Sequence, residues 1–246
     1  MVALPITIAI DPTLEAADAA MVLISKRERR RSYLGMSSIG DPCSRKLWYG
    51  YHTTHREVFT AETLKRFADG HASENVMADR LRLVDGVTLM TVDPATGRQW
   101  ELTDFDGRFA GHMDGKIIGL KQAPRTLHVW EGKAVNEKSF EKFKSLKRTL
   151  GEKNALKEWN GVYWHQAQSY MGYSKLTRSY MTVCTPGVRE WDSVRTEFDP
   201  LAFEAIKDKA RRILDAKVPL ARISNTPSWW QCSWCHHRVE CHNLKE

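Results

Sequence analysis

The amino-acid sequence predicts an α/β protein in which a mixed central sheet is flanked by helices. Apolar residues recur with helical spacing in the first third of the chain and again in its later part. The middle of the chain instead has short runs with a period of two, separated by turn residues. With 246 residues, of which 42% are hydrophobic, the chain is long enough to bury the core of one such domain.

The helices expected before the sheet follow from spacing and from start signals. A first helix is expected over 12–31, and a short one over 43–51, after the turn residues of 37–42. A long amphipathic helix over 61–83 has apolar residues three to five positions apart, including Leu64 and Leu81. These segments should cover one side of the sheet or lead into it.

The later elements follow from the change of period. Strands are expected over 87–92, 100–105, 108–118, 127–135, 178–185 and 190–196. Helices are expected over 138–157, 159–173 and 199–217. This order of helix, strands, helix, strands and helix suits a mixed sheet in a single domain spanning 1–246.

Composition narrows the classes of function. No run reaches the roughly 18 consecutive apolar residues that a membrane helix needs, and the first ten residues lack the charge pattern of a signal peptide. We therefore expect a cytoplasmic protein without membrane contact. Five cysteines in such a compartment argue against a disulfide framework.

The charge pattern fits a nucleic-acid partner and a simpler interpretation equally well. The net charge is +7, and much of it lies in 26–31 and in the seven Lys or Arg residues of 138–157. A polyanion is attracted to such a surface, but both clusters also fit solvated helix faces. The candidate DNA contacts are Arg45, Lys46, Lys144, Lys147 and Arg148.

Two carboxylates and one lysine form the main candidate site. Asp114 lies in one expected strand, and the next strand has Glu131 and Lys133 on the same face, because strand side chains alternate with a period of two. Paired carboxylates suit Mg²⁺ or Mn²⁺, which activates water and neutralises charge on a phosphate. Taken singly, each residue is more typical of a turn or an exposed ion pair.

This pattern resembles the core of the RecB-like PD-(D/E)xK nucleases. That family has Gly-x-x-Asp-Gly, then Glu-x-Lys, then Gln-x-x-x-Tyr on the following helix, where this chain has Gln166 and Tyr170. The resemblance implies a restriction-endonuclease-like core and a further metal ligand on the upstream helix. We expect Glu74 in that role, with His71 as the alternative. The proline of the family name is replaced by Met113.

The cysteines form a second pattern. Cys232, Cys235 and Cys241 crowd the end of the chain, and Cys43 begins an early helix. Four thiolates suit a metal site, either an iron–sulfur cluster or Zn²⁺ with nearby histidines. The arrangement resembles the iron–sulfur members of the same superfamily, which include CRISPR-associated adaptation exonucleases and their phage relatives. It implies a [4Fe–4S] clasp joining 37–51 to 229–246. Cys184 should be a plain buried thiol.

Together the resemblances imply a metal-dependent DNA exonuclease that acts in recombination, repair or phage DNA processing, in a bacterium or a phage-infected cell. In this interpretation Asp114, Glu131 and Glu74 hold the metal, Lys133 assists the water, and Gln166 with Tyr170 steers the strand. Two alternatives are a non-catalytic metal-stabilised DNA-binding module and a zinc-stabilised interaction protein. The exonuclease could also form a homo-oligomer or bind a recombination partner protein.

Overall fold

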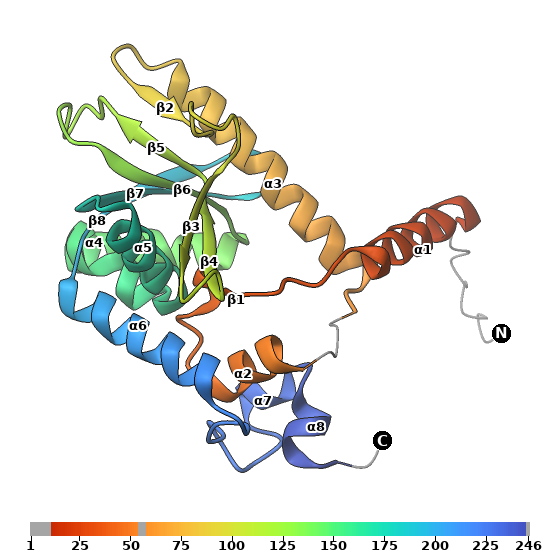
Figure 1. Ribbon diagram of the computed structural model, residues 1–246. Coiled ribbons are helices and arrows are strands. Elements are labelled where there is room, and N and C mark those ends of the chain that lie inside the picture. Colours follow the sequence, from red (N-terminus) through yellow and green to blue (C-terminus); the bar gives the residue numbers. More distant parts are fainter. Residues whose placement is uncertain (1–10, 54–57, 245–246) are drawn as a thin grey trace.

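A five-stranded mixed sheet forms the centre of the molecule in this computed structural model, which describes residues 11–53 and 58–244 (Figure 1). The strand order is β2-β5-β6-β7-β8, with β6 and β7 parallel and the other pairs antiparallel. The bounds are β2 Thr88–Met90, β5 Gly115–Ile118, β6 His128–Ala134, β7 Arg178–Cys184 and β8 Trp191–Glu197. The mixed sheet expected from the sequence is therefore present.

A second, smaller sheet corrects one expectation. It has the order β1-β4-β3 and consists of β1 Leu34–Gly35, β3 Trp100–Asp104 and β4 Phe109–Met113. The single strand expected over 108–118 was wrong, because the chain leaves one sheet and enters the other at Asp114. The β5–β6 ladder ends at the Gly115–Trp130 pair, and the next N–H, that of Gly132, is bound by the Asp114 side chain at 3.0 Å. A side chain thus replaces the backbone partner.

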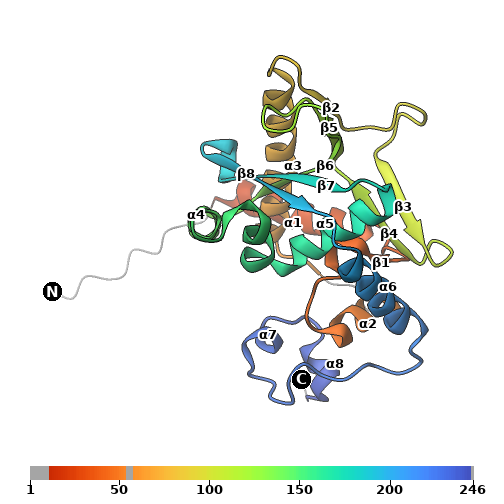
Figure 2. The same cartoon turned by 90° about the vertical axis from the view of Figure 1, so that its left-hand side faces the viewer.

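Helices cover both faces of the larger sheet (Figures 1 and 2). The helix α3 (Ala61–Arg82) packs on one face, where Trp130 joins Met77 and Leu81 in the smaller hydrophobic cluster. On the other face Val129 belongs to the main core together with α4 (Glu137–Trp159), α5 (Gly161–Ser174) and α6 (Pro200–Asp215). Burial on both faces explains why β6 is apolar on both sides before Glu131.

The remaining helices lie outside these layers. The helix α1 (Pro12–Arg27) projects from the body beside α3, and it ends four residues earlier than expected because Glu28 is extended (Figure 1). The helices α2 (Ser44–His52), α7 (Trp230–Ser233) and α8 (Arg238–His242) form a module below α6. Two 3₁₀ turns, Met36–Ser38 and Pro186–Val188, complete the described elements. Within the described residues, no helix combines the length and apolarity needed to cross a membrane.

Candidate functional site

The six residues expected in the carboxylate site line one cavity of about 390 Å³. They come from four parts of the fold: the sheet junction, strand β6, helix α3 and helix α5. The sequence-predicted residues are Glu74, Asp114, Glu131, Lys133, Gln166 and Tyr170. Asn160 caps α5 by accepting the N–H groups of Val162 and Tyr163, so this helix begins at Gly161 rather than at Trp159.

Glu131 lies at the centre of the hydrogen-bond network. Its Oε1 accepts from Lys133 Nζ and from Gln166 Nε2, both at 2.6 Å. Lys133 Nζ also lies 3.7 Å from Asp114 Oδ2, so one ammonium compensates two carboxylates. Glu131 is only 4% exposed, and its buried Oε2 has no hydrogen-bond partner among the described residues. A buried carboxylate oxygen of this kind is costly unless a cation or donor satisfies it.

Burial and mutual repulsion make this cluster hard to ionise fully. Burial, followed by the charge of Asp114, raises the pKa of Glu131 well above its usual value. The same two causes raise the pKa of Glu74 from 4.5 to about 7. Burial disfavours the Lys133 ammonium, but the charges of Glu131 and Asp114 outweigh burial and raise its pKa. A divalent cation would favour the ionised form of both glutamates.

Two glycines allow the elements to approach. A Cβ on Gly111 would lie 2.7 Å from the Tyr170 ring, and a Cβ on Gly132 would lie 3.1 Å from Glu74 Cγ. The glycines of the Gly-x-x-Asp and Glu-Gly-Lys segments therefore let α5 and α3 bring their polar side chains against the sheets.

The cavity also contains residues that the sequence did not identify as site residues. Gln99 Nε2 lies 3.5 Å from Asp114 Oδ1 at the start of β3. Arg31, Tyr33, Ser37 and His112 complete the polar wall, and His71, the alternative ligand, is exposed there. Only Arg31 had a signal, since it ends the basic cluster at 26–31.

The ammonium of Lys133 lies between the carboxylates where a shared cation would fit. Consistent with this, no three His, Cys, Asp or Glu side chains in 11–53 and 58–244 are already gathered in an arrangement that could hold a metal ion. The donor set itself, carboxylate oxygens with an unsatisfied Oε2, fits a hard cation.

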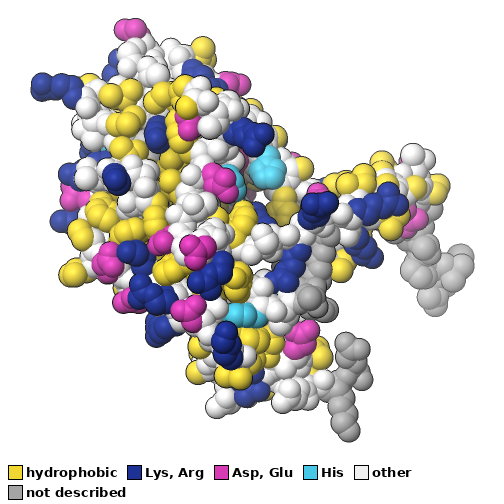
Figure 3. Space-filling view, in the orientation of Figure 1, with side chains coloured by type: hydrophobic (Ala, Val, Ile, Leu, Met, Phe, Trp, Pro, Cys, Tyr) yellow, Lys and Arg dark blue, Asp and Glu magenta, His cyan; other side chains and the backbone are white. Residues whose placement is uncertain are grey.

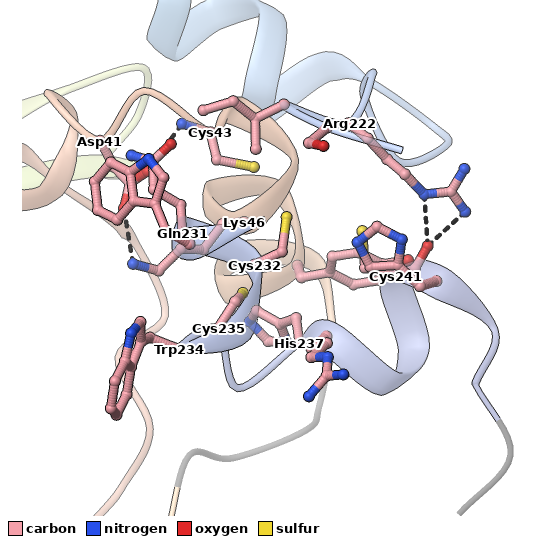
Figure 4. Close-up of a pocket in the computed structure, with 16 residues that line it drawn as sticks. Asp41, Cys43, Lys46, Arg222, Gln231, Cys232, Trp234, Cys235, His237 and Cys241 are labelled. Atoms are coloured by element: carbon pink, nitrogen blue, oxygen red, sulfur yellow. Dashed lines mark hydrogen bonds and ion pairs between the residues drawn. The ribbon is translucent and has the colours of Figure 1, made fainter. Parts of the chain in front are cut away.

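The four terminal-region cysteines line a second cavity of about 240 Å³ (Figure 4). Cys43 is the N-cap of α2, while Cys232, Cys235 and Cys241 come from the segment of α7 and α8. Burial raises the pKa of the Cys232 thiol, and the nearby Cys43 and Cys241 sulfurs raise it further. Segments nearly 190 residues apart thus line one cavity, although within residues 11–53 and 58–244 no three of these thiols lie close enough together to hold a metal ion as they stand. Cys184 is fully buried in β7, away from them, as expected.

The candidate DNA-contacting cations mostly bind within the protein. Arg45 Nη1 donates to the carbonyl of Leu220 at 2.8 Å, and Lys46 pairs with Asp41 at 2.7 Å. The Arg45 contact ties α2 to the C-terminal segment, whereas the Lys46 ion pair is local. On α4, acidic partners lie within ion-pair distance of two lysines: Lys144 with Glu141 and Glu190, and Lys147 with Asp192. Arg148 is exposed.

Comparisons with solved structures agree on the fold. The crystal structure of SSO0001 superposes with a TM-score of 0.51 at 12% identity, covering 96% of this chain and 99% of that one. The alkaline exonuclease LHK-Exo from Laribacter hongkongensis gives 0.50 at 17% identity, covering 81% and 90%. Its complex with dAMP gives 0.50 at 15% identity, with the same coverage.

In sequence, no protein-family model matches this chain and no curated protein matches it. The structural likeness, at such low identity, shows a shared fold. That fold is consistent with the restriction-endonuclease-like core expected from the sequence.

Proposed function

We propose that this chain is a divalent-metal-dependent deoxyribonuclease that removes nucleotides from the ends of DNA. The observation that carries the proposal is the buried Glu131 carboxylate, which shares Lys133 with Asp114 and keeps one oxygen without a partner. Structural carboxylates are rarely left in this state. The fold likeness to an alkaline exonuclease that was solved with the mononucleotide dAMP supports the same class of activity.

Asp114, Glu131 and Glu74 would hold the metal, since their oxygens are the ligands that Mg²⁺ and Mn²⁺ prefer. When bound, such an ion supplies an activated water and stabilises negative charge on the phosphate. Lys133 keeps a fixed positive charge beside the reacting phosphate, because the surrounding carboxylates maintain its protonation. Gln166 orients Glu131 through the 2.6 Å hydrogen bond, and it also donates to Tyr170 Oη at 3.3 Å.

For the cysteine cavity we propose a structural [4Fe–4S] cluster. The proposal is supported by the four cysteines, from opposite ends of the chain, that line one cavity of about 240 Å³, which is more space than a single ion needs. The cluster would connect α2 to the α7–α8 segment and restrict the unfolded chain across a long loop. Anaerobically purified protein should be brown and contain about four iron atoms per chain. A colourless protein with stoichiometric zinc would replace this part of the proposal with a zinc site.

Digestion of end-labelled DNA with Mn²⁺ tests the enzymatic proposal. Asp114→Asn should reduce cleavage at least about 1,000-fold, because it removes a shared carboxylate from the metal and the lysine. Asp208→Asn, on the exposed side of α6, is the matched control and should leave cleavage unchanged.

A non-catalytic DNA-binding module is the alternative. It predicts that wild-type protein binds DNA in a salt-sensitive manner yet releases no nucleotide with Mg²⁺ or Mn²⁺. That result would overturn the proposed activity. Single- and double-stranded substrates labelled at either end would also define the strand preference and the direction of digestion.

A further inference from the structure

The outer face of α1 is apolar, which is the reverse of an ordinary surface helix. The residues of α1 that are least exposed, and so face the body, are Asp18, Met21, Val22 and Ser25. Asp18 forms a 2.6 Å ion pair with Lys65 of α3 on this inner side. A surface helix usually directs its charges to solvent and its apolar residues to the core.

The opposite face presents small and large apolar side chains to solvent (Figure 3). Positions three and four apart lie on one side of a helix, and here they bring Leu23 and Ile24 beside a row of alanines. Leu23 is 53% exposed and Ile24 is 62% exposed. The exposed alanines of this outer face are Ala16, Ala17, Ala19 and Ala20. Grouped apolar exposure of this kind marks an interaction surface.

The distribution of size and charge along α1 identifies the partner. On the outer face the larger side chains, Leu23 and Ile24, lie toward the C-terminal end and the alanines toward the N-terminal end. Leu14, in the first turn, lies on the side of Asp18 and Met21. The first half contains Glu15 and is capped by Asp11, whereas Arg27 is in the last turn. An antiparallel pair of identical helices would place large residues on small ones and acidic ends beside basic ends. Its helix dipoles would also oppose each other favourably.

We propose that α1 pairs antiparallel with α1 of a second copy of this chain, about a two-fold axis near Ala20. In this arrangement Leu23 and Ile24 of each copy cover Ala17 and Ala16 of the other. A parallel pair would instead bring the like charges of the two copies together. The interface does not depend on the proposed catalytic activity, because α1 contributes no residue to the lining of the carboxylate cavity.

The dimer is expected to be weak. A helix of 16 residues is about 24 Å long. One pair of such helices buries less accessible surface than a standard stable interface, which buries about 1,600 Å² in total. We therefore expect a dissociation constant roughly in the micromolar range, so that the fraction of dimer depends on protein concentration.

Sedimentation velocity of the full chain, from about 1 to 100 µM, tests this proposal. Wild type should shift from monomer to dimer over this range. Ala20→Glu places two carboxylates on the axis and should raise the dissociation constant at least about tenfold, and Leu23→Glu should do the same. Ala205→Glu, which changes an exposed alanine of α6 in the same way, should leave the equilibrium unchanged. Matching melting temperatures would show that the variants are folded.

Three outcomes would overturn the proposal. Wild type that stays monomeric at the highest concentration has no self-pairing face. A dimer that survives both α1 substitutions is formed by a different surface. A monomer that instead floats with anionic phospholipid vesicles, and loses this binding in Leu23→Glu but not in Ala205→Glu, would assign the apolar face to a membrane surface.

Discussion

The carboxylate cavity and the cysteine cavity differ in what holds their side chains in place. Glu131 and Lys133 belong to the central strand β6, where they pair with Met181 and Val183 of β7, and Gln166 lies on a buried helix of the main core. The cysteines instead come from the N-cap of α2, from two helices of only four and five residues, and, for Cys235, from the turn between them. One site is built by the core of the fold, and the other is built by its periphery.

Contacts between remote segments take the place of a core around the cysteines. Trp48 Nε1 donates to the carbonyl of Ala216 at 2.9 Å, and Arg222 Nε donates to that of Cys241 at 2.7 Å. His237 is buried by stacking on Tyr49. Trp48 and Tyr49 belong to the main core, but of the described residues of α7 and α8 only Cys232 is a buried apolar side chain. If the proposed cluster is bound, we therefore expect it to contribute more to the stability of the cysteine module than the proposed metal contributes to that of the carboxylate site.

Cys235→Ser should give the largest effect, on stability rather than on chemistry. Loss of one thiolate should remove most of the bound metal and destabilise the α7–α8 segment by on the order of 5 kcal/mol. Limited proteolysis should then cut between α6 and α8, while the residues of the carboxylate cavity stay protected. The measurements are metal content and protease protection of the folded protein.

Cys184→Ala is the control for this prediction. It removes a buried thiol that belongs to β7, so metal content should not change. Equal metal content and equal protection in Cys235→Ser and wild type would show that the two cavities do not differ in this way.

Lys133→Met should give the next largest effect, and it should act at the other cavity. Removing the ammonium leaves Glu131 and Asp114 without their shared cation, so the metal-free protein should lose roughly 3–5 kcal/mol of stability. Cleavage of DNA should fall about 100- to 1,000-fold. Added Mn²⁺ should restore much of the stability without the activity.

Lys116→Met, on the neighbouring strand β5, is the matched substitution and should change neither quantity strongly. If Mn²⁺ did not stabilise Lys133→Met more than it stabilises wild type, the two carboxylates would not share a cation.

The comparison also separates what the sequence could predict from what it could not. A period of two placed Glu131 and Lys133 on one face, and a spacing of four placed Gln166 beside Tyr170, because these relations are local. The interruption between β4 and β5 at Asp114 depends on a hydrogen bond from the N–H of Gly132, 18 positions away. The local period of two does not change there, so the sequence predicted one continuous strand.

Strand β1 was missed for a related reason. Its two residues are too few to show any period, and they pair with β4 some 75 positions later. Tyr33 and Gln99, which line the carboxylate cavity, therefore had no sequence pattern of their own. The cysteine spacing indicated a shared site, whereas the carbonyl contacts that orient the module have no residue-type signature.

Glu74→Gln should give a smaller effect that depends on pH. The fold raises the pKa of Glu74 to about 7, so the metal-free native state binds a proton that the unfolded chain releases near 4.5. Stability of the metal-free wild type should therefore fall as pH rises from 5 to 8, and a neutral glutamine removes this contribution.

Thermal unfolding of wild type and Glu74→Gln over this pH range measures how much more stability wild type loses between pH 5 and pH 8. This extra loss should be on the order of 1 kcal/mol after allowance for the partial exposure of Glu74. With Mn²⁺ present, wild type should be the more stable of the two at pH 8, since the ionised carboxylate is the ligand. Parallel pH curves without metal would mean that Glu74 is not held among the other carboxylates.

The smallest predicted effect concerns three basic residues of α4, Lys144, Lys147 and Arg148, which line neither cavity. Lys144 and Lys147 are within ion-pair distance of acidic residues of the same protein, so a phosphate must compete with Glu190 or Asp192 for them. Arg148 is the exposed cation of this group. Arg148→Ala should weaken DNA binding about two- to threefold at low salt, and Lys144→Ala should weaken it less. Fluorescence anisotropy over a salt series measures both, and a larger loss in Lys144→Ala would mean that DNA displaces the acidic partners.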